Sequence, residues 1–381
     1  MRILIASGIF APEAGGPATY AAALGSNLAQ RGWNVDVVTY SQEARYDADT
    51  KYPFALTRIV RGNKFLNRFR FFITAYKLAK GADIIYTLDW FAAGLPVALT
   101  AKLRGVPYVV RVGGDYLWEQ KYLESGAPPM PLKTFYERGL HRQLAYRPAY
   151  WLISFVLSHA ALIVFNSDIQ KELYERYYQL SPARCATVEN PVPKFEQIKR
   201  ERSSKEFVFW GRFIVMKNLD TLIRAFAQAR IPKDYTLALI GGGPQKEKLE
   251  QLVRELGISD RVRFERGLPL EQVISRVKNA RAFVLPSWTD ISPNQVYEAL
   301  SIELPSLVTK ENYLSIREKL PDMIEPTSVD DVAAKLELLA DDQEYTIFSS
   351  KFNSIQYVRS WDTVTEEHLA VFAGISGGMK G

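Results

Sequence analysis

The amino-acid sequence predicts an α/β protein built from two tandem doubly wound, Rossmann-like domains. Its 381 residues exceed the length of one ordinary domain. Strand-like and helix-like segments alternate throughout, which is typical of parallel sheets with crossover helices. The alternation stops at Asn190-Pro191-Val192-Pro193, passes a charged stretch at 199–205, and restarts at residue 206. A second domain therefore begins near the middle of the chain.

The first predicted domain covers residues 1–195. Arg2–Ser7 is an apolar run that ends at Gly8 and predicts the first strand. Pro17 suits the first position of a helix over 17–31, and Gly32 is expected to end that helix. Further strands are predicted at 34–39, 83–87, 107–112 and 161–166.

The second predicted domain covers residues 196–354. Strands are predicted at 206–210, 236–240, 261–265, 282–286 and Ser306–Thr309, and helices at 217–229, 245–256, 270–279 and 293–302. Residues 355–381 include an amphipathic stretch at 360–372, and we expect this segment to pack back onto the first domain. Ligands of doubly wound folds lie beyond the carboxyl ends of the strands, so the loops there should carry the chemistry.

Cysteine and histidine content excludes several kinds of site. Cys185 is the single cysteine, which rules out a disulfide framework and a Cys-rich metal site and fits a reducing compartment. The three histidines, His141, His159 and His368, are widely spaced and match no zinc pattern. We therefore expect no metal and no cofactor.

One uncharged segment has the composition of a possible membrane-spanning helix. Residues 148–167 carry no Lys, Arg, Asp or Glu and approach the length of a spanning helix. The segment divides sensibly at His159-Ala160 into a buried helix at 149–158 and a buried strand at 161–165. The first apolar run of the chain is too short for a signal peptide. We therefore expect a cytoplasmic protein, with an association at the inner membrane face left open.

Charge is unevenly distributed. Residues 1–195 carry a net charge of +8 and the remainder −2. Segment 51–80 has no acidic residue and eight basic ones, which are Lys51, Arg58, Arg61, Lys64, Arg68, Arg70, Lys77 and Lys80. Aromatic residues interleave with them, a pattern that suits an anionic membrane surface or an anionic acceptor. The alternative is a helix with a solvated basic face; nucleic acid is not expected as a partner.

Three local patterns suggest chemistry. Gly15-Gly16-Pro17 precedes a helix, where backbone N–H groups can face an anion. Arg212 follows a predicted strand and Lys217 opens a predicted helix, so both cations can stabilise a leaving diphosphate without a metal. Asp290 and Glu298 flank the start of another helix, and ionised carboxylates accept hydrogen bonds from sugar and ribose hydroxyls. Each pattern alone also fits ordinary turns or surface charges.

Taken together and in this order, the motifs resemble the family-four retaining glycosyltransferases of the GT-B fold, also called glycosyl transferases group 1. The resemblance covers nearly the whole chain. It includes the Gly15-Gly16 loop, the Gly211-Arg212-x4-Lys217 segment, the Gly241-Gly242-Gly243-Pro244 loop and the Asp290-x7-Glu298 segment. Residues 262–267 and 282–287 follow the usual spacing of this family.

The resemblance implies a role for each matching residue. Gly15 and Gly16 would approach the donor diphosphate, Arg212 and Lys217 would hold it, and Glu298 would bind the ribose. The remaining implied donor-side residues are Asp290 at the transferred sugar, Ser292 and Asn294 near sugar and phosphate, and Glu265, Arg266 and Gly267 at the base. Asp115 would lie where the catalytic region meets the acceptor, in the N-terminal, acceptor-side domain.

The chain departs from the pattern of the family at three positions. Asp290 stands where glutamate is common, which shortens the side chain by one methylene. Ser292-Pro293 replaces Phe-Gly, and Pro293 has no N–H to offer a ligand. Gly113 lies where many members carry histidine, so a histidine-assisted mechanism is in doubt.

The sequence thus predicts an enzyme that transfers a sugar from a nucleotide-diphosphate donor to an acceptor hydroxyl, with retention implied by the resemblance. The acceptor is expected to be a lipid-linked saccharide or another envelope or exopolysaccharide precursor. Two alternatives are a GT-B nucleotide-sugar epimerase and a nucleotide-sugar-binding protein without turnover.

Overall fold

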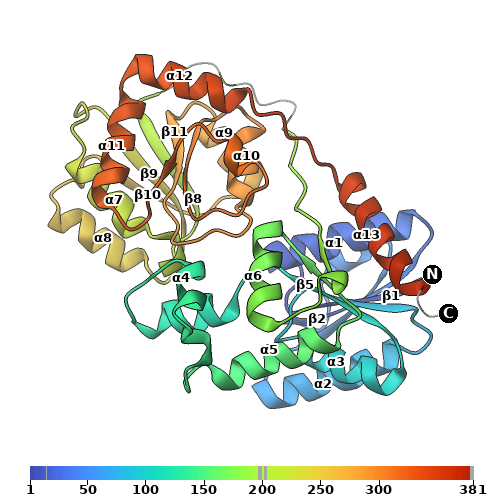
Figure 1. Cartoon of the computed structure of the whole chain (residues 1–381). Helices are drawn as coiled ribbons and strands as arrows, with labels where there is room; N and C mark the ends of the chain where they lie inside the picture. Colours follow the sequence, from blue (N-terminus) through green and yellow to red (C-terminus); the bar gives the residue numbers. More distant parts are fainter. Residues whose placement is uncertain (14, 196–199, 201–203, 378–381) are drawn as a thin grey trace. The chain divides into compact units, whose positions relative to one another are not determined.

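The computed structural model describes residues 1–381 except 14, 196–199, 201–203 and 378–381. Two compact units divide the chain (Figure 1). Unit 1 contains Met1–Leu117, Gly139–Pro191 and Arg359–Gly381, and unit 2 contains Trp118–Arg138 and Val192–Val358. Most of the charged stretch at 199–205 and the last four residues of the tail lie outside the described residues.

Unit 1 is built on a seven-stranded sheet in the order β3-β2-β1-β4-β5-β6-β7, with every neighbouring pair parallel. The strands are β1 (Arg2–Ser7), β2 (Asn34–Ser41), β3 (Ala55–Val60), β4 (Ile84–Thr87), β5 (Tyr108–Val112), β6 (Leu162–Phe165) and β7 (Cys185–Thr187). The predicted strands are confirmed. Strands β3 and β7 were not predicted, and β3 lies inside the basic segment 51–80.

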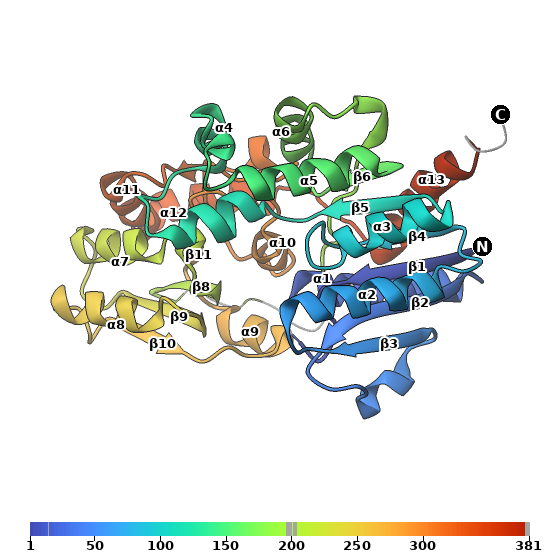
Figure 2. The same cartoon turned by 90° about the horizontal axis from the view of Figure 1, so that it is seen from below.

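The helices of unit 1 cover both faces of this sheet. They are α1 (Gly16–Gln30), α2 (Lys64–Leu78), α3 (Gly94–Arg104), α5 (Arg147–His159), α6 (Asp168–Tyr178) and α13 (Trp361–Gly377), with short helices η1 (Asp47–Lys51), η4 (Leu140–Arg142) and η5 (Pro182–Arg184). Right-handed crossovers place α2, α3, α5 and α6 on one face and α1 on the other. Figure 2 shows α2, α3 and α5 side by side.

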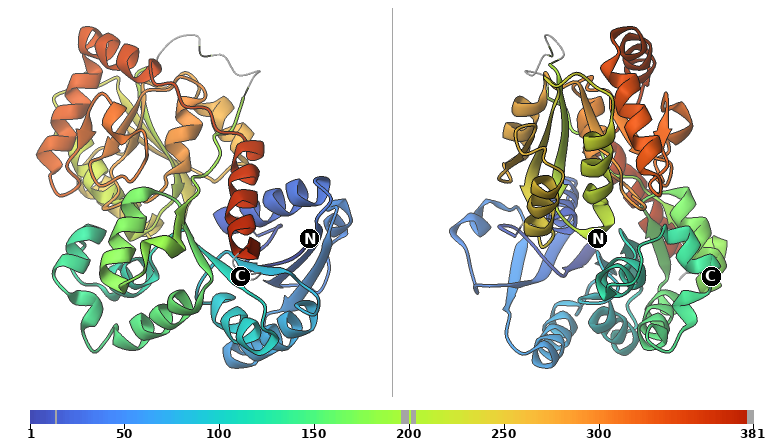
Figure 3. Two further views of the ribbon diagram at one scale, coloured as in Figure 1. Left: turned by 45° about the vertical axis from the view of Figure 1, so that its right-hand side comes forward. Right: turned by 90° about the vertical axis from the view of Figure 1, so that its left-hand side faces the viewer.

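Unit 2 is a six-stranded parallel sheet in the order β10-β9-β8-β11-β12-β13 with helices on both faces (Figure 3). The strands are β8 (Glu206–Arg212), β9 (Thr236–Gly242), β10 (Val262–Glu265), β11 (Ala282–Leu285), β12 (Ser306–Thr309) and β13 (Met323–Ile324). The helices are η6 (Val215–Lys217), α7 (Leu219–Gln228), α8 (Lys246–Glu255), α9 (Leu270–Val277), α10 (Asn294–Leu300), η7 (Arg317–Lys319), α11 (Val329–Ala340) and α12 (Asp342–Asn353). The predicted doubly wound restart after residue 206 is confirmed.

An early segment of the chain belongs to unit 2. Residues 118–138 form η2 (Leu117–Tyr122), η3 (Leu123–Ser125) and α4 (Leu132–Glu137), and cluster with that unit although they precede β6 of unit 1. The Leu132 amide donates to Thr289 Oγ1 at 2.9 Å, in the loop after β11. No periodicity in the sequence predicted that residues 118–138 belong to unit 2.

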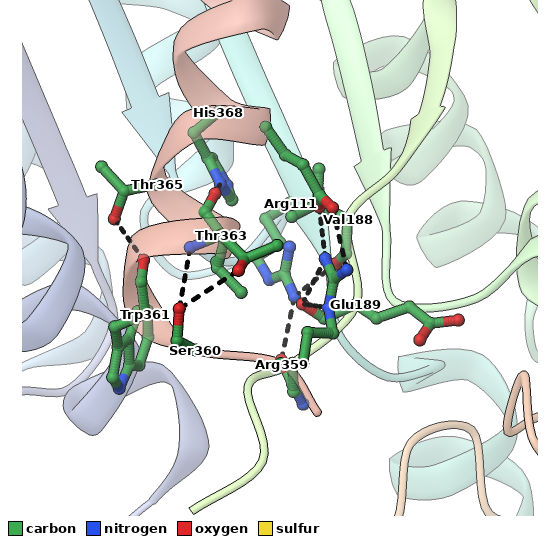
Figure 4. A network of polar contacts seen from close by, with 12 residues as sticks. Arg111, Val188, Glu189, Arg359, Ser360, Trp361, Thr363, Thr365 and His368 are labelled. Carbon is green, nitrogen blue, oxygen red and sulfur yellow. Dashed lines mark hydrogen bonds and ion pairs between the residues drawn. The ribbon is translucent and has the colours of Figure 1, made fainter. Parts of the chain in front are cut away.

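Helix α13 packs on α1 of unit 1, and a polar network holds its start (Figure 4). The Arg359 guanidinium donates to the Glu189 carbonyl at 3.4 Å and forms an ion pair with Glu367. Further along, buried His368 lies 2.8 Å from the Tyr86 hydroxyl through Nε2, and burial lowers its pKa to about 3. The histidine is therefore a neutral packing residue.

The segment at 148–167 corrects one prediction. It does divide into a helix, α5, and a strand, β6, but α5 is not buried throughout, because Trp151 is 65% exposed. Within the described residues, no helix is both long and apolar enough to cross a membrane.

Candidate active site

Three glycines bring two strand ends of unit 2 into backbone contact. Gly211 at the end of β8 and Gly241 and Gly243 at the end of β9 all have φ between 142° and 153°. A Cβ atom on Gly241 would lie 2.0 Å from the Gly211 carbonyl oxygen, and one on Gly243 would lie 2.5 Å from that of Phe213. The backbone conformation favours glycine at all three positions, and the lack of space also requires it at Gly241 and Gly243. The loops at the carboxyl ends of β8 and β9 therefore form one closely packed edge.

Arg212 is the last residue of β8 and is exposed at this edge. Within the described chain, no side chain or carbonyl forms a hydrogen bond with its guanidinium. An unpaired guanidinium offers up to five N–H donors in a planar fork, which matches the geometry of phosphate oxygens.

Lys217 is buried, with only 6% of its surface exposed, and forms an ion pair with Asp290. It closes the short helix η6 rather than opening α7, so the predicted helix start is two residues early. Ser287 donates to the same Asp290 Oδ2 oxygen at 3.0 Å. An ammonium has three donors, and Asp290 engages one of them. The arrangement fixes the position of Lys217 and leaves donors for a further anion.

The residue after Lys217 explains why this turn is rigid. Asn218 adopts a left-handed conformation with φ of 53°. Its amide donates to the carbonyls of Pro286 at 3.1 Å and Pro326 at 2.8 Å, and its Oδ1 accepts from Thr221 at 2.8 Å. Asparagine tolerates this conformation better than most residues. The contacts tie the Lys217 turn to the loop after β11, where Asp290 lies.

Glu298 is on α10 and accepts a hydrogen bond from the indole of Trp210 on β8. The Trp210 Nε1 to Glu298 Oε2 distance is 2.7 Å. Burial raises the pKa of Glu298, and the Trp210 hydrogen bond and the charge of Lys217 oppose this shift. Asp290 and Glu298 thus share a feature: the structure commits one oxygen of each carboxylate and leaves the other uncommitted among the described residues.

The three residues expected at the nucleotide base differ in their surroundings. Glu265 pairs with Arg276 of α9 at 2.7 Å, and Arg276 also forms a bidentate pair with Glu206. Glu265 is therefore paired within unit 2, although it shares the single positive charge of Arg276 with Glu206. Arg266 and Gly267 are exposed, and Gly267 lies beside Gly241. Ser292 is partly buried and Asn294 is exposed at the start of α10.

The candidate residues of unit 1 have a different character. Gly15 and Gly16 are exposed at the start of the 15-residue helix α1. A Cβ on Gly16 would meet nothing within 4 Å, whereas one on Gly15 would lie 2.6 Å from Ile9 Cδ1. The first turn of α1 has no acidic residue, so the positive end of its dipole is not offset there.

Asp115 is 1% exposed and lies in the loop after β5. Its Oδ2 accepts a hydrogen bond of 2.9 Å from the hydroxyl of Tyr174 on α6, which is also buried. Gly113, two residues earlier, is exposed. The carboxylate of Asp115 therefore links the loop to a helix of its own unit.

Trp210, Ser287 and Asn218 hold the site residues but were not predicted from the sequence. Trp210 lies two residues before Arg212 on the same strand, so period-2 alternation could have placed both side chains on one face. Asn218 directly follows Lys217 and Ser287 lies three residues before Asp290, but these two segments are far apart in the sequence, and only the fold brings them together.

Two tandem doubly wound units with polar residues beyond the strand ends define a class of α/β proteins whose ligands lie at that edge of the sheet. Two family models match the chain, and together they cover most of it. "Glycosyltransferase Family 4" matches residues 14–194 and "Glycosyl transferases group 1" matches residues 193–353. The chain belongs to the group 1 glycosyltransferases, a family of transferase enzymes.

Individual glycosyltransferases are also similar to parts of this chain. A GDP-mannose-dependent phosphatidylinositol monomannoside mannosyltransferase of Mycolicibacterium smegmatis is 38% identical over 81 residues, which are 21% of each chain. The stretches matched in the first curated relatives cover between 21% and 45% of the length of those relatives.

Solved structures of similar fold cover nearly the whole chain. Sucrose-phosphate synthase from Thermosynechococcus elongatus superposes with a TM-score of 0.76 at 18% identity and covers 99% of each chain. Anabaena HepE in complex with UDP and glucose gives 0.73 at 15% identity, covering 98% of this chain and all of that one. The fold is that of the GT-B glycosyltransferases.

Proposed function

We propose that this protein transfers a sugar from a nucleotide-diphosphate sugar to a hydroxyl group of a glycan or lipid-linked acceptor. The observation that carries the proposal is that Arg212, which is exposed and has no partner among the described residues, and the buried Lys217–Asp290 pair lie at the same strand edge of unit 2. Membership of the glycosyltransferase family and the UDP-bound state of a protein with the same fold support it.

Arg212 and Lys217 would stabilise the charge that develops on the leaving diphosphate as the glycosidic bond breaks. Lys217 is held in place by Asp290, so little reorganisation is needed when the anion arrives. Two cations at one edge can supply this stabilisation without a metal ion, and we propose a metal-independent reaction on that ground.

The uncommitted carboxylate oxygens suit the hydroxyl groups of the donor. We propose that the open oxygen of Glu298 accepts from the ribose and that of Asp290 from the transferred sugar. Ser292 and Asn294 would line the sugar and phosphate, and Arg266 and Gly267 the base. Glu265 would act there through its pair with Arg276, which holds the carboxylate in place.

In unit 1 we propose that the backbone N–H groups at Gly15 and Gly16 bind the diphosphate. Asp115 would position the loop after β5 rather than touch the substrate, because its carboxylate is buried and bonded to Tyr174. The resemblance of the motifs supports retention at the anomeric carbon, through attack on the same face that the leaving phosphate departs from.

The acceptor is proposed to be a precursor of an envelope or exopolysaccharide glycan. The basic character of residues 1–195 supports an anionic or lipid-phosphate-linked acceptor. One relative is named as a mannosyltransferase that acts on phosphatidylinositol monomannoside, which is a lipid acceptor. We propose a cytoplasmic location, at the inner face of the membrane. Nucleotide sugars are available in that compartment, and its reducing conditions suit a protein with a single cysteine.

A donor screen tests the proposal. The protein is incubated with UDP-, GDP-, ADP- and dTDP-sugars, first by thermal shift and then for slow release of the nucleoside diphosphate. Release of the diphosphate supports a transferase. A new isomer of the nucleotide sugar would instead indicate an epimerase, and stabilisation without either product would indicate a binding protein.

A further inference from the structure

Three neighbouring helices of unit 1 have an unusual composition. Helices α2, α3 and α5 lie side by side on one face of the sheet (Figure 2). Together they contain seven lysine and arginine residues and no aspartate or glutamate. The next helix in this layer, α6, contains three acidic residues, which are Asp168, Glu172 and Glu175. The acid-free region thus ends at α6.

The same three helices expose large apolar side chains. Six of the twelve large hydrophobic residues that are strongly exposed in the described chain lie on these helices or just before α5. They are Leu66, Phe69, Leu99, Leu103, Leu144 and Trp151, with exposures of 48%, 61%, 42%, 65%, 84% and 65%. Scattered exposed hydrophobics are ordinary, but a cluster on adjacent helices marks an interaction surface.

Helix α5 shows how the apolar and basic groups combine. Arg147, Trp151, Phe155 and His159 follow one another at intervals of four and form one stripe along the helix. The Trp151 and Phe155 rings stack with centroids 6.2 Å apart, and the Phe155 and His159 rings are 4.4 Å apart. A tryptophan beside cationic residues suits the boundary between lipid headgroups and acyl chains.

The structure also changes which charges of segment 51–80 can act at a surface. Arg58 is buried in an ion pair with Asp49, Arg61 pairs with Glu13, and the Arg68 guanidinium lies 4.2 Å from the ring centroid of Phe91. These three arginines are occupied within unit 1. Arg70 and Lys77 of α2, Lys102 of α3 and Arg147 of α5 are exposed.

We propose that the outer face of α2, α3 and α5, which we call the three-helix face, binds the protein to the surface of an anionic lipid bilayer. Charge decides between the occupants of this face. A second copy of the chain would bring two acid-free basic faces together, whereas anionic headgroups neutralise them. The exposed apolar side chains then enter the headgroup region. This inference goes beyond the proposed transfer reaction. An enzyme bound to a bilayer surface would meet a lipid-linked acceptor there.

The charge contribution is tested with Arg70→Gln, Lys102→Gln and Arg147→Gln combined. Binding to vesicles of phosphatidylcholine with phosphatidylglycerol is measured by sedimentation at low salt. Each basic residue near such a surface contributes about fivefold in affinity, so the triple variant should lose about 100-fold. The matched control is Lys248→Gln, Arg254→Gln and Lys351→Gln in unit 2, where all three side chains are exposed. This control should bind as the wild type does.

The apolar contribution is tested with Leu103→Ser and Trp151→Ser combined. Its control is Ile347→Ser and Val358→Ser, two exposed apolar residues of unit 2. Only the first pair should weaken vesicle binding, by at least tenfold, and the loss should persist at high salt, where charge attraction is screened. Thermal unfolding and affinity for the nucleoside diphosphate should match the wild type in all four variants.

Three outcomes would overturn the proposal. The wild type could ignore anionic vesicles even at low salt. The control variants could lose as much affinity as the variants of the three-helix face, which would mean non-specific attraction. The wild type could form a dimer that Leu103→Ser and Trp151→Ser dissociate while vesicle binding stays unchanged, which would make this face a self-interface. Diphosphate release, measured separately, shows whether the proposed transfer reaction fails or holds independently.

Discussion

The strand edge of unit 2 and that of unit 1 are built on the same doubly wound plan but organise their polar groups differently. In unit 2, Lys217, Asp290 and Glu298 each bond to a neighbour, and the second carboxylate oxygen of Asp290 and of Glu298 bonds to no described residue. In unit 1, the Asp115 carboxylate accepts from Tyr174, and the groups that we propose for the ligand are the backbone N–H groups of an exposed glycine loop. Charged chemistry is therefore expected to depend on unit 2, while unit 1 contributes backbone and shape.

The largest effect is expected from Lys217→Met, because the substitution acts on both the reaction and the fold. Removing one partner of a buried ion pair typically costs about 3–5 kcal/mol, and removing a donor to developing charge costs about 10²–10³ in rate. Adding Asp290→Asn should recover much of the stability but none of the turnover. Chemical denaturation and nucleoside diphosphate release measure the two quantities. A double variant as unstable as Lys217→Met alone would contradict the proposed coupling.

Arg212→Gln should separate catalysis from folding. The guanidinium has no partner within the described chain, so the free energy of unfolding should change by less than about 0.5 kcal/mol. Turnover should nevertheless fall by about 10²–10³, since the charge is lost at the diphosphate. Lys217→Met and Arg212→Gln should therefore reduce turnover by similar factors but lower the free energy of unfolding by very different amounts. Near-normal turnover of folded Arg212→Gln would remove the arginine from the proposed diphosphate site.

Much of the fold follows from local sequence signals. The apolar runs at Arg2–Ser7 and Ser306–Thr309 gave strands with their predicted bounds, because both faces of a parallel sheet are buried. The absence of charged residues at 148–167 predicts a buried helix at 149–158, yet Trp151 of α5 faces solvent. Hydrophobicity alone does not say which side of a helix packs, and for this reason the part of the three-helix face on α3 and α5 was not predicted.

The candidate site shows the same limit. Motif spacing predicted Arg212, Lys217, Asp290 and Glu298 as separate elements of one ligand site. It did not predict that Asp290 pairs with Lys217, which is 73 residues away. Such pairings depend on the order of strands in the sheet, and β8 lies next to β11 although β9 and β10 intervene in the sequence.

Glu298→Gln should weaken nucleotide binding by about 10- to 100-fold, the value of a hydrogen bond to a charged acceptor. Calorimetry with the bare nucleoside diphosphate measures it. Trp210→Phe is the matched comparison, because it frees the second carboxylate oxygen without removing the charge. Unchanged affinity in Glu298→Gln would separate this residue from the ribose.

The pKa of Glu298 gives a test in which affinity and stability move in opposite directions. Burial raises this pKa above its ordinary value of 4.5, so the folded state holds the proton more tightly than the unfolded state. As the pH falls through the raised pKa, nucleotide affinity should drop because the ionised acceptor is lost, while the contribution of Glu298 to stability should rise. Glu298→Gln should remove both changes. Parallel pH profiles in the variant and the wild type would contradict the assignment.

The smallest effect is expected in unit 1, at Asp115. Asp115→Asn keeps an oxygen that can accept from Tyr174, so the free energy of unfolding should change little, whereas Asp115→Ala leaves a buried hydroxyl without this partner and should cost about 1–3 kcal/mol. Tyr174→Phe is the matched control for the hydrogen bond. If Asp115 only positions its loop, the asparagine variant should turn over almost as fast as the wild type. A stable Asp115→Asn variant with strongly reduced turnover would mean that the charge itself takes part in the reaction. The two strand edges would then share the charged chemistry that we assign to unit 2.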